Sequence, residues 1–178
     1  FRSHGYWTAM KLAGEYARLN HQVIHARITR ALGQPEVLDT IFNRHNYAWV
    51  EEITTADGRV QSAIVHRKGA TPARKGQQGI IPGSMATPAY LVRGKGDPES
   101  LNSASHGSGR VLSRTQAKQQ LAGRNLKREL EQKGITLIGG GLDEAPEAYK
   151  PIETVLKHQA GLGEKVAKLE PKVVRMAS

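Results

Sequence analysis

Cysteine is absent from the 178 residues of this chain, which excludes disulfide bonds and metal sites built on its thiolates. Any metal ion bound by these residues must therefore use histidine, carboxylate or water ligands. The sequence also has no apolar run of membrane-spanning length and no charged segment followed by a hydrophobic leader. We therefore expect a soluble, cytoplasmic protein with no membrane partner.

Negative charge is scarce in this sequence. The chain has 26 lysine and arginine residues against 16 aspartate and glutamate residues, which gives a net charge of +10. This balance favours a polyanionic partner, because lysine and arginine that replace condensed counterions provide most of the non-specific affinity for nucleic acid. A basic surface that only keeps the protein soluble is the alternative interpretation.

Aromatic residues make up only 5% of the chain, whereas its 19 glycines concentrate in the middle, where we expect functional loops. The length fits one domain or part of one. Apolar spacing and capping residues predict helices over residues 6–32, 113–133 and 152–160. Strands are predicted over residues 49–54, 60–66, 89–93, 135–138 and 172–176, with Asp57-Gly58 in a hairpin turn. The mixture predicts the α+β class.

Two histidines on the first predicted helix, His21 and His25, are four residues apart and would share one helix face. This spacing suits a metal ion. Neither a carboxylate nor a third ligand accompanies them, so we do not expect a metal site there.

The segment from Asn102 to Arg110 reads Asn-Ser-Ala-Ser-His-Gly-Ser-Gly-Arg. Glycines let the backbone approach an anion, serine hydroxyls add donors, and arginine provides a bidentate charge. Histidine adds a titratable nitrogen nucleophile. The segment therefore predicts phosphate chemistry centred on His106, with an ordinary exposed glycine and serine loop as the alternative.

Further motifs occur around this segment in a fixed order. They are His45–Tyr47, Arg67–Ala70, Gly79–Met85, Val92–Gly96 and Val111–Lys118. Together with the Ser-His-Gly motif, they resemble the RtcB family of RNA-splicing ligases. The resemblance covers nearly the whole chain and is strongest from Phe42 to Lys118.

The resemblance implies an RtcB-like α+β fold, present in part, in which mixed short strands and glycine-rich active-site loops are flanked by helices. Residues 1–178 would be the C-terminal part of a single catalytic domain. The implied activity is a GTP- and Mn²⁺-dependent RNA ligase that joins an RNA 3′-phosphate or 2′,3′-cyclic phosphate to a 5′-hydroxyl through a histidine–GMP intermediate. Its RNA would be tRNA halves or cleaved RNA, and an accessory activating protein is a further partner that the resemblance leaves open.

Residue roles are also implied by the resemblance. His106 would be the nucleophile, and His45 would bind manganese. GTP or GMP would be contacted by His45, Asn46, Pro82, Gly83, Ser84, Met85, Ala89, Glu99, Gly107, Ser108, Gly109, Tyr149 and Met176. RNA or phosphate contacts are expected from Arg67, Lys68, Arg93, Lys95 and Arg110. The chain departs from the family at Ala89, where serine is common, at Met176, where a lysine reaches guanine, and at Ser108, where alanine is common.

Three functions remain open from the sequence. The first is the ligase. The second is a non-catalytic, basic RNA-binding module of the same fold, which the departures at Ala89 and Met176 keep open. The third is a related nucleotidyl transferase that uses another nucleotide or a damaged RNA. The family's other manganese ligands are an aspartate, a cysteine and two histidines that precede the matched region, so we expect the chain alone to be inactive or nearly so.

Overall fold

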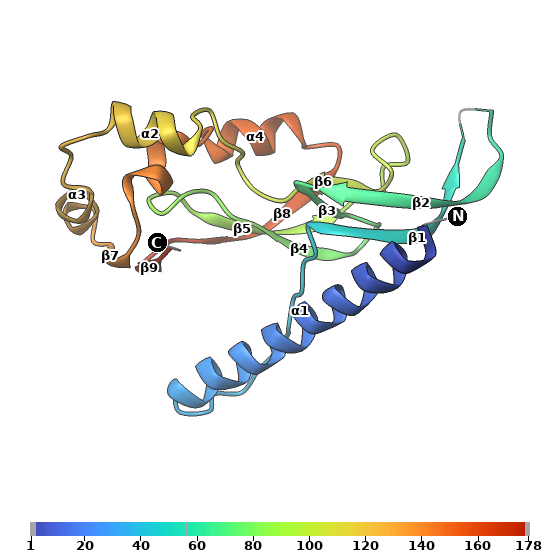
Figure 1. Ribbon diagram of the computed structural model, residues 1–178, viewed down its shortest axis with the longest axis horizontal. Coiled ribbons are helices and arrows are strands. Elements are labelled where there is room, and N and C mark those ends of the chain that lie inside the picture. The colour runs from blue at the N-terminus through green and yellow to red at the C-terminus, as the bar shows by residue number, and fades with distance from the viewer. Residues whose placement is uncertain (1–2, 56, 177–178) are drawn as a thin grey trace.

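The computed structural model describes residues 3–55 and 57–176, and it combines helices with small sheets, which confirms the α+β class (Figure 1). The α-helices are α1 (Ser3–Ala31), α2 (Arg114–Gln120), α3 (Leu126–Gln132) and α4 (Ile152–His158), and two 3₁₀ turns are η1 (Leu142–Glu144) and η2 (Pro146–Ala148). The strands are β1 (Asn46–Thr54), β2 (Val60–Lys68), β3 (Ala70–Pro72), β4 (Gln78–Ile81), β5 (Ala89–Gly94), β6 (Ser103–Ser105), β7 (Thr136–Gly139), β8 (Gly163–Leu169) and β9 (Val173–Arg175). None of the described helices combines the length and apolar character that crossing a membrane requires.

An antiparallel sheet of order β4-β5-β8 forms the centre of the molecule, and α4 lies over one of its faces (Figure 1). Strand residues Ile81, Tyr90 and Val92 pack there against Ile152 and Leu156 of α4, and all five are buried. Burial of a large apolar side chain stabilises a fold by about 1.5–3 kcal/mol. This core fixes β4 and β5, whose connecting loop includes Pro82 to Met85.

A second core joins the loop after β4 to the C-terminal third of the chain. Met85 is buried there against Leu126 and Leu130 of α3 and Leu137 of β7. β7 pairs in parallel with β9, which brings the last strand beside this core. Since Met85 belongs to the predicted nucleotide loop, the second core determines where that loop lies.

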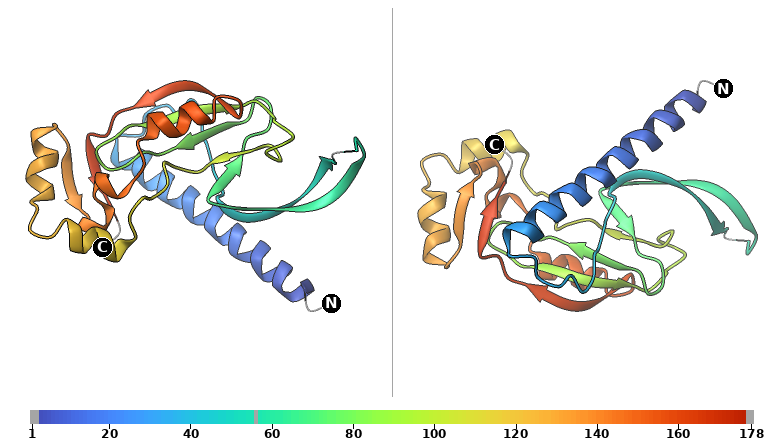
Figure 2. Two further views of the ribbon diagram at one scale, coloured as in Figure 1. Left: turned by 90° about the horizontal axis from the view of Figure 1, so that it is seen from above. Right: turned by 90° about the horizontal axis from the view of Figure 1, so that it is seen from below.

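The hairpin β1–β2 and the helix α1 extend away from this body (Figure 2). α1 ends in a Schellman arrangement, in which Gly33 takes a φ of +82° and the Gln34 N–H donates to the Thr29 carbonyl at 2.9 Å. The ring of Tyr47 lies against Gly14, so a side chain at that position would require the Tyr47 ring to shift. Much of the apolar surface of α1 stays exposed, including Tyr16 at 72%.

Several predicted elements are confirmed, and one is wrong. The helix over residues 6–32, the two hairpin strands and the strands near residues 89, 136 and 173 are present within a few residues of their predicted bounds. Residues 113–133 instead form two helices. Ser113 caps α2 in a capping box with Gln116, whereas Gly123 takes a φ of +83° and Asn125 caps α3, so the chain turns between them.

Candidate active site

His45 and His106 lie face to face, although they are 61 positions apart in the sequence. Their rings stack with centroids 4.8 Å apart and an interplanar angle of 9°. Gly69 joins them, because its N–H donates to the His45 carbonyl at 3.0 Å and its carbonyl accepts from the His106 N–H at 3.3 Å. Gly69 has a φ of +73°, a conformation that favours glycine, so the Arg-Lys-Gly-Ala motif serves this junction.

The environment of His106 favours its neutral form. Burial, followed by the neighbouring His45, lowers the pKa of the His106 imidazole below its ordinary value of 6.5. A neutral imidazole has a free lone pair on one ring nitrogen and can attack phosphorus near pH 7. The geometry therefore suits His106 to act as a nucleophile.

A cavity of about 500 Å³ opens beside His106. Its volume falls in the range of about 300–1,000 Å³ that is typical of small-ligand pockets. Four segments form its wall: the β4–β5 loop, the loop from β6 to α2, the η1–η2 region and the last strand. The lining residues are Pro82, Gly83, Ser84, Met85, His106, Gly107, Ser108, Gly109, Arg110, Arg114, Glu144, Tyr149, Val174 and Met176.

The β4–β5 loop is held tightly in its observed shape. A side chain at Gly83 would approach the Pro88 carbonyl oxygen to 2.6 Å, so only glycine fits there. The Ser84 N–H donates to the Thr87 hydroxyl at 2.7 Å, and the buried Met85 anchors the loop in the second core. The loop therefore presents a preformed edge to the cavity.

Ser108 links the β4–β5 loop to the glycine-rich loop between β6 and α2. Its N–H donates to the Pro82 carbonyl at 3.2 Å, its hydroxyl donates to the Gly83 carbonyl at 3.1 Å, and the residue is 4% exposed. Both donors are therefore engaged within the protein. Ser108 was expected to donate to a phosphate, but in this structure its two donors hold the two loops together. Gly107 and Gly109 line the cavity with their backbone.

Arg110 is firmly bound to the far wall of the cavity. Its Nε donates to the Leu112 carbonyl at 2.9 Å, its Nη1 donates to the Tyr149 hydroxyl at 3.1 Å, and its Nη2 donates to the Asp143 carbonyl. Its guanidinium also lies over the Tyr149 ring, 4.9 Å from the centroid. Burial and the neighbouring Glu144 carboxylate raise the pKa of Tyr149, so its hydroxyl stays protonated.

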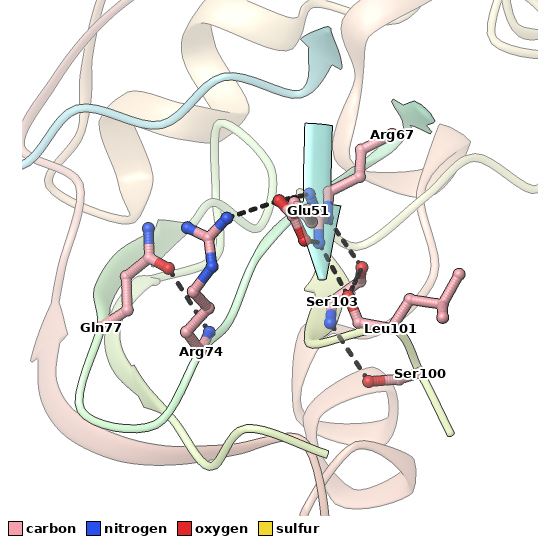
Figure 3. A network of polar contacts seen from close by, with 7 residues as sticks. All are labelled: Glu51, Arg67, Arg74, Gln77, Ser100, Leu101 and Ser103. Carbon is pink, nitrogen blue, oxygen red and sulfur yellow. Dashed lines mark hydrogen bonds and ion pairs between the residues drawn. The ribbon is translucent and has the colours of Figure 1, made fainter. Parts of the chain in front are cut away.

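Arg67 has a different place from the one expected. It is 2% exposed, and its guanidinium makes a bidentate pair with Glu51 at 2.7 and 2.9 Å (Figure 3). It also donates to the Ser103 hydroxyl at 2.8 Å and to the Leu101 carbonyl at 2.7 Å. The hydrogen bonds and charge of Arg67, with the charge of Arg74, hold the pKa of the Glu51 carboxyl below its usual range. With its donors engaged, Arg67 supports the turn before β6 and is not placed to contact RNA.

Other predicted residues lie away from the cavity wall. Asn46 begins β1, paired with Lys68 of β2, and both are exposed. Ala89 pairs with Leu169 at the start of β5, and Glu99 is exposed in the turn before β6. Arg93 lies 4.0 Å from Glu164, and the Lys95 ammonium donates to the Ala160 carbonyl at 2.6 Å. These residues border the molecule's surface and do not join the nucleotide loops in one pocket.

The described part of the chain does not complete a metal site. Across residues 3–55 and 57–176, no three histidine or carboxylate side chains come together in a way that would hold an ion. Among the described residues, His45 therefore has His106 as a neighbouring imidazole, and no carboxylate joins these two histidines to complete a group of three metal ligands. The rings of His21 and His25 lie 6.0 Å apart, edge to face, and likewise lack a third ligand in that region.

Glu144 and Val174 line the cavity but were not predicted as site residues, whereas Arg114 belongs to the Val111–Lys118 motif that was expected beside the site. Glu144 is 7% exposed although it is charged. The sequence feature that could have indicated it is an acidic pair, Asp143-Glu144, which comes shortly before Tyr149, a residue predicted to contact the nucleotide. Arg110 and Arg114, the two arginines that follow His106, require counter-ions, and both form ion pairs with Glu144.

Comparison with known proteins agrees with these motifs. The sequence profile of the family described as tRNA-splicing ligase RtcB matches residues 2–177. RNA-splicing ligase RtcB of Mycobacterium bovis is 37% identical over 190 residues, covering 93% of this chain and 43% of that protein. tRNA-splicing ligase RtcB is 38% identical in Archaeoglobus fulgidus and 34% in Thermococcus kodakarensis, each over 195 residues, covering 93% of this chain and 40% of those proteins.

This chain spans about two fifths of the length of these relatives. The profile match extends across every segment that forms the cavity, from the β4–β5 loop to β9. On this evidence the chain belongs to the RtcB family of tRNA-splicing ligases.

Proposed function

We propose that this chain carries the guanylylation half of an RNA ligase active site. The most direct support is the position of His106, whose pKa is lowered. It lines a cavity together with the β4–β5 loop and the loop between β6 and α2. The relatives are named RNA-splicing and tRNA-splicing ligases, which supports RNA ligation as the overall reaction. RNA with broken ends is the proposed substrate, and GTP is the proposed nucleotide.

In the proposed first step, a ring nitrogen of neutral His106 attacks the α-phosphorus of GTP. A phosphorus–nitrogen bond forms, the bond from the α-phosphorus to the bridging oxygen breaks, and pyrophosphate leaves with that oxygen. A 2′,3′-cyclic phosphate end first takes up water, which breaks the bond from phosphorus to the 2′-oxygen and leaves a 2′-hydroxyl and a 3′-phosphate. GMP then passes from His106 to the RNA 3′-phosphate, and a 5′-hydroxyl displaces GMP to form the new phosphodiester. Backbone from Gly107 and Gly109 and the guanidinium of Arg114 line the space that the phosphates would occupy.

His45 is the single residue of this chain that we propose as a manganese ligand. The described residues bring no carboxylate or additional histidine cluster to that imidazole, so they do not fit a complete site. We propose that the remaining ligands belong to residues that precede this chain in the whole protein. The cofactors of the whole protein would then be GTP as substrate and Mn²⁺ as metal.

A ligation assay with defined RNA ends tests the proposed activity. The full-length protein, with GTP and Mn²⁺, should join a 3′-phosphate or 2′,3′-cyclic phosphate end to a 5′-hydroxyl end, because GMP must be transferred to a terminal phosphate. The same RNAs with 3′-hydroxyl and 5′-phosphate ends should remain unjoined. Joining of the second pair with equal efficiency would contradict the proposed reaction.

The salt dependence of RNA binding separates the ligase from a binding module of the same fold. Arg93 and Lys95 project from the end of β5, and replacing both with alanine should lower the log–log salt slope of RNA affinity by about two if both contact phosphates. Each phosphate contact releases counterions, so each contributes roughly one unit of slope.

A matched control is the exposed pair Lys127 and Arg128 on α3, whose replacement removes the same charge from a distant helix. That control should change the slope less than the Arg93 and Lys95 change does. Loss of guanylylation with an unchanged slope would instead assign Arg93 and Lys95 to the nucleotide. A flattened slope in a protein that never guanylylates would favour the binding module.

A further inference from the structure

One buried carboxylate contacts several side chains of the cavity wall. Glu144 lies in η1, is 7% exposed, and has Oε1 at 3.2 Å from Nη2 of Arg114 and 3.5 Å from Nη1 of Arg110. The hydroxyl of Tyr149 donates to its other oxygen, Oε2. All four side chains line the same cavity. Both oxygens of a single carboxylate are thus engaged by cavity residues.

The two arginines differ in how much else holds them. Arg110 has two carbonyl acceptors besides Glu144, and its side chain is 26% exposed. The side chain of Arg114 is 72% exposed, and its other acidic neighbour, Asp143, lies farther away at 3.9 Å and also faces Lys118 at 3.8 Å. A long exposed side chain loses rotamer freedom when it is held in one orientation. Glu144 is therefore the closest acidic partner that orients Arg114 toward the cavity.

The charge balance of the cluster fits a site for phosphate. Arg110, Arg114 and Lys118 face Asp143 and Glu144, so the cations outnumber the carboxylates. The carboxylate of Glu144 is covered by these partners, while the Arg114 guanidinium extends to solvent at the cavity. An incoming phosphate would meet a guanidinium whose direction is already set, which lowers the entropic cost of binding.

We propose that Glu144 is a positioning residue for nucleotide binding, and that it acts by holding Arg114 at the wall of the cavity. The inference rests on the proposed function, because it assumes that the cavity receives the triphosphate of GTP. Glu144 does not contact the reacting atoms in this proposal. Its effect should therefore appear in the KM for GTP and not in the rate of the chemical step.

The test compares guanylylation kinetics of the full-length protein with those of Glu144→Gln, Arg114→Gln and the double variant. Glu144→Gln keeps the size of the side chain and removes its charge, and Arg114→Gln changes an exposed side chain that should not affect folding. Each single variant should raise the KM for GTP by roughly tenfold, the loss expected for one charge-assisted hydrogen bond, with kcat changed less than about threefold. The double variant should be no worse than Arg114→Gln alone.

Glu147→Gln is the matched control. Glu147 is an exposed glutamate three positions away that pairs with Arg124, outside the cavity. It should leave KM unchanged. An unchanged KM in Glu144→Gln, or an equal increase in the Arg114→Gln background, would overturn the inference while wild-type guanylylation remained intact. A wild-type protein that neither binds GTP nor becomes labelled would overturn the proposed function and this inference together.

Discussion

Replacing His106 with alanine should abolish covalent labelling of the full-length protein by GTP in the presence of Mn²⁺. The imidazole is the proposed nucleophile, and among the described residues that line the cavity no other side chain offers a ring nitrogen. The label in the unchanged protein should be lost in acid and retained in base, because a phosphoramidate breaks when its nitrogen is protonated. Radiolabelled GTP and gel electrophoresis after acid or base treatment measure both properties.

His66→Ala is a matched control for this experiment. His66 is an exposed histidine on β2, paired with Ala48 of β1, and it does not line the cavity. Labelling should survive this change. Labelling that persists in His106→Ala, or a bond that resists acid, would show that another residue is the nucleophile.

Removing either partner of the buried Glu51–Arg67 pair should lower the free energy of unfolding by about 3–5 kcal/mol. Arg67→Met leaves the Glu51 carboxylate without its bidentate partner, and it also removes the donors to Ser103 and Leu101 (Figure 3). Leu101 and Asn102 both take a φ of +52°, which asparagine tolerates but which is a strained conformation for leucine, so the turn at Leu101 depends on such support. Urea unfolding of the chain measures the change.

The exposed pair Asp57–Arg59 in the β1–β2 loop provides the control. Its side chains are 50% and 83% exposed. Arg59→Met should therefore change the free energy of unfolding by less than about 1 kcal/mol. The double variant Glu51→Gln with Arg67→Met should cost less than the sum of the single changes, since it leaves no unpaired charge buried: Arg74, the other partner of Glu51, has a side chain that is 48% exposed. A loss below about 1 kcal/mol for Arg67→Met would contradict the structural role given to the pair.

The sequence predicted the local elements of the site well. Gly33 ended the first helix, Ser113 capped α2, and the Pro82–Met85 and Gly107–Gly109 segments lie together on one cavity. The two helix boundaries depend on residues close to one another in the chain, so their signals are local, whereas the meeting of the two loops on one cavity depends on tertiary contacts. Glycine at positive φ and a serine followed by a capping-box glutamine carry such signals.

The partners of charged residues could not be predicted in the same way. Arg67 belongs to an Arg-Lys-Gly-Ala motif that suggests phosphate binding, yet Glu51, 16 positions earlier, buries it. The positioning role proposed for Glu144 depends on its hydrogen bond with Arg114, which lies 30 positions earlier. β8 was also missed, because it is rich in charged residues, its residues are exposed from Glu164 to Leu169 with no alternation of burial, and only pairing with β5 makes it a strand. Such features depend on tertiary contacts that spacing alone does not reveal.

His106 carries GMP in the proposed reaction, and mass spectrometry of a tryptic digest tests this assignment directly. Trypsin cleaves after Lys95 and Arg110, which releases residues 96–110, a peptide with His106 as its sole histidine and no lysine. After incubation of the full-length protein with GTP and Mn²⁺, and digestion without acid, we expect this peptide to carry one GMP on His106. GMP on a peptide that lacks His106, with residues 96–110 unmodified, would contradict the account.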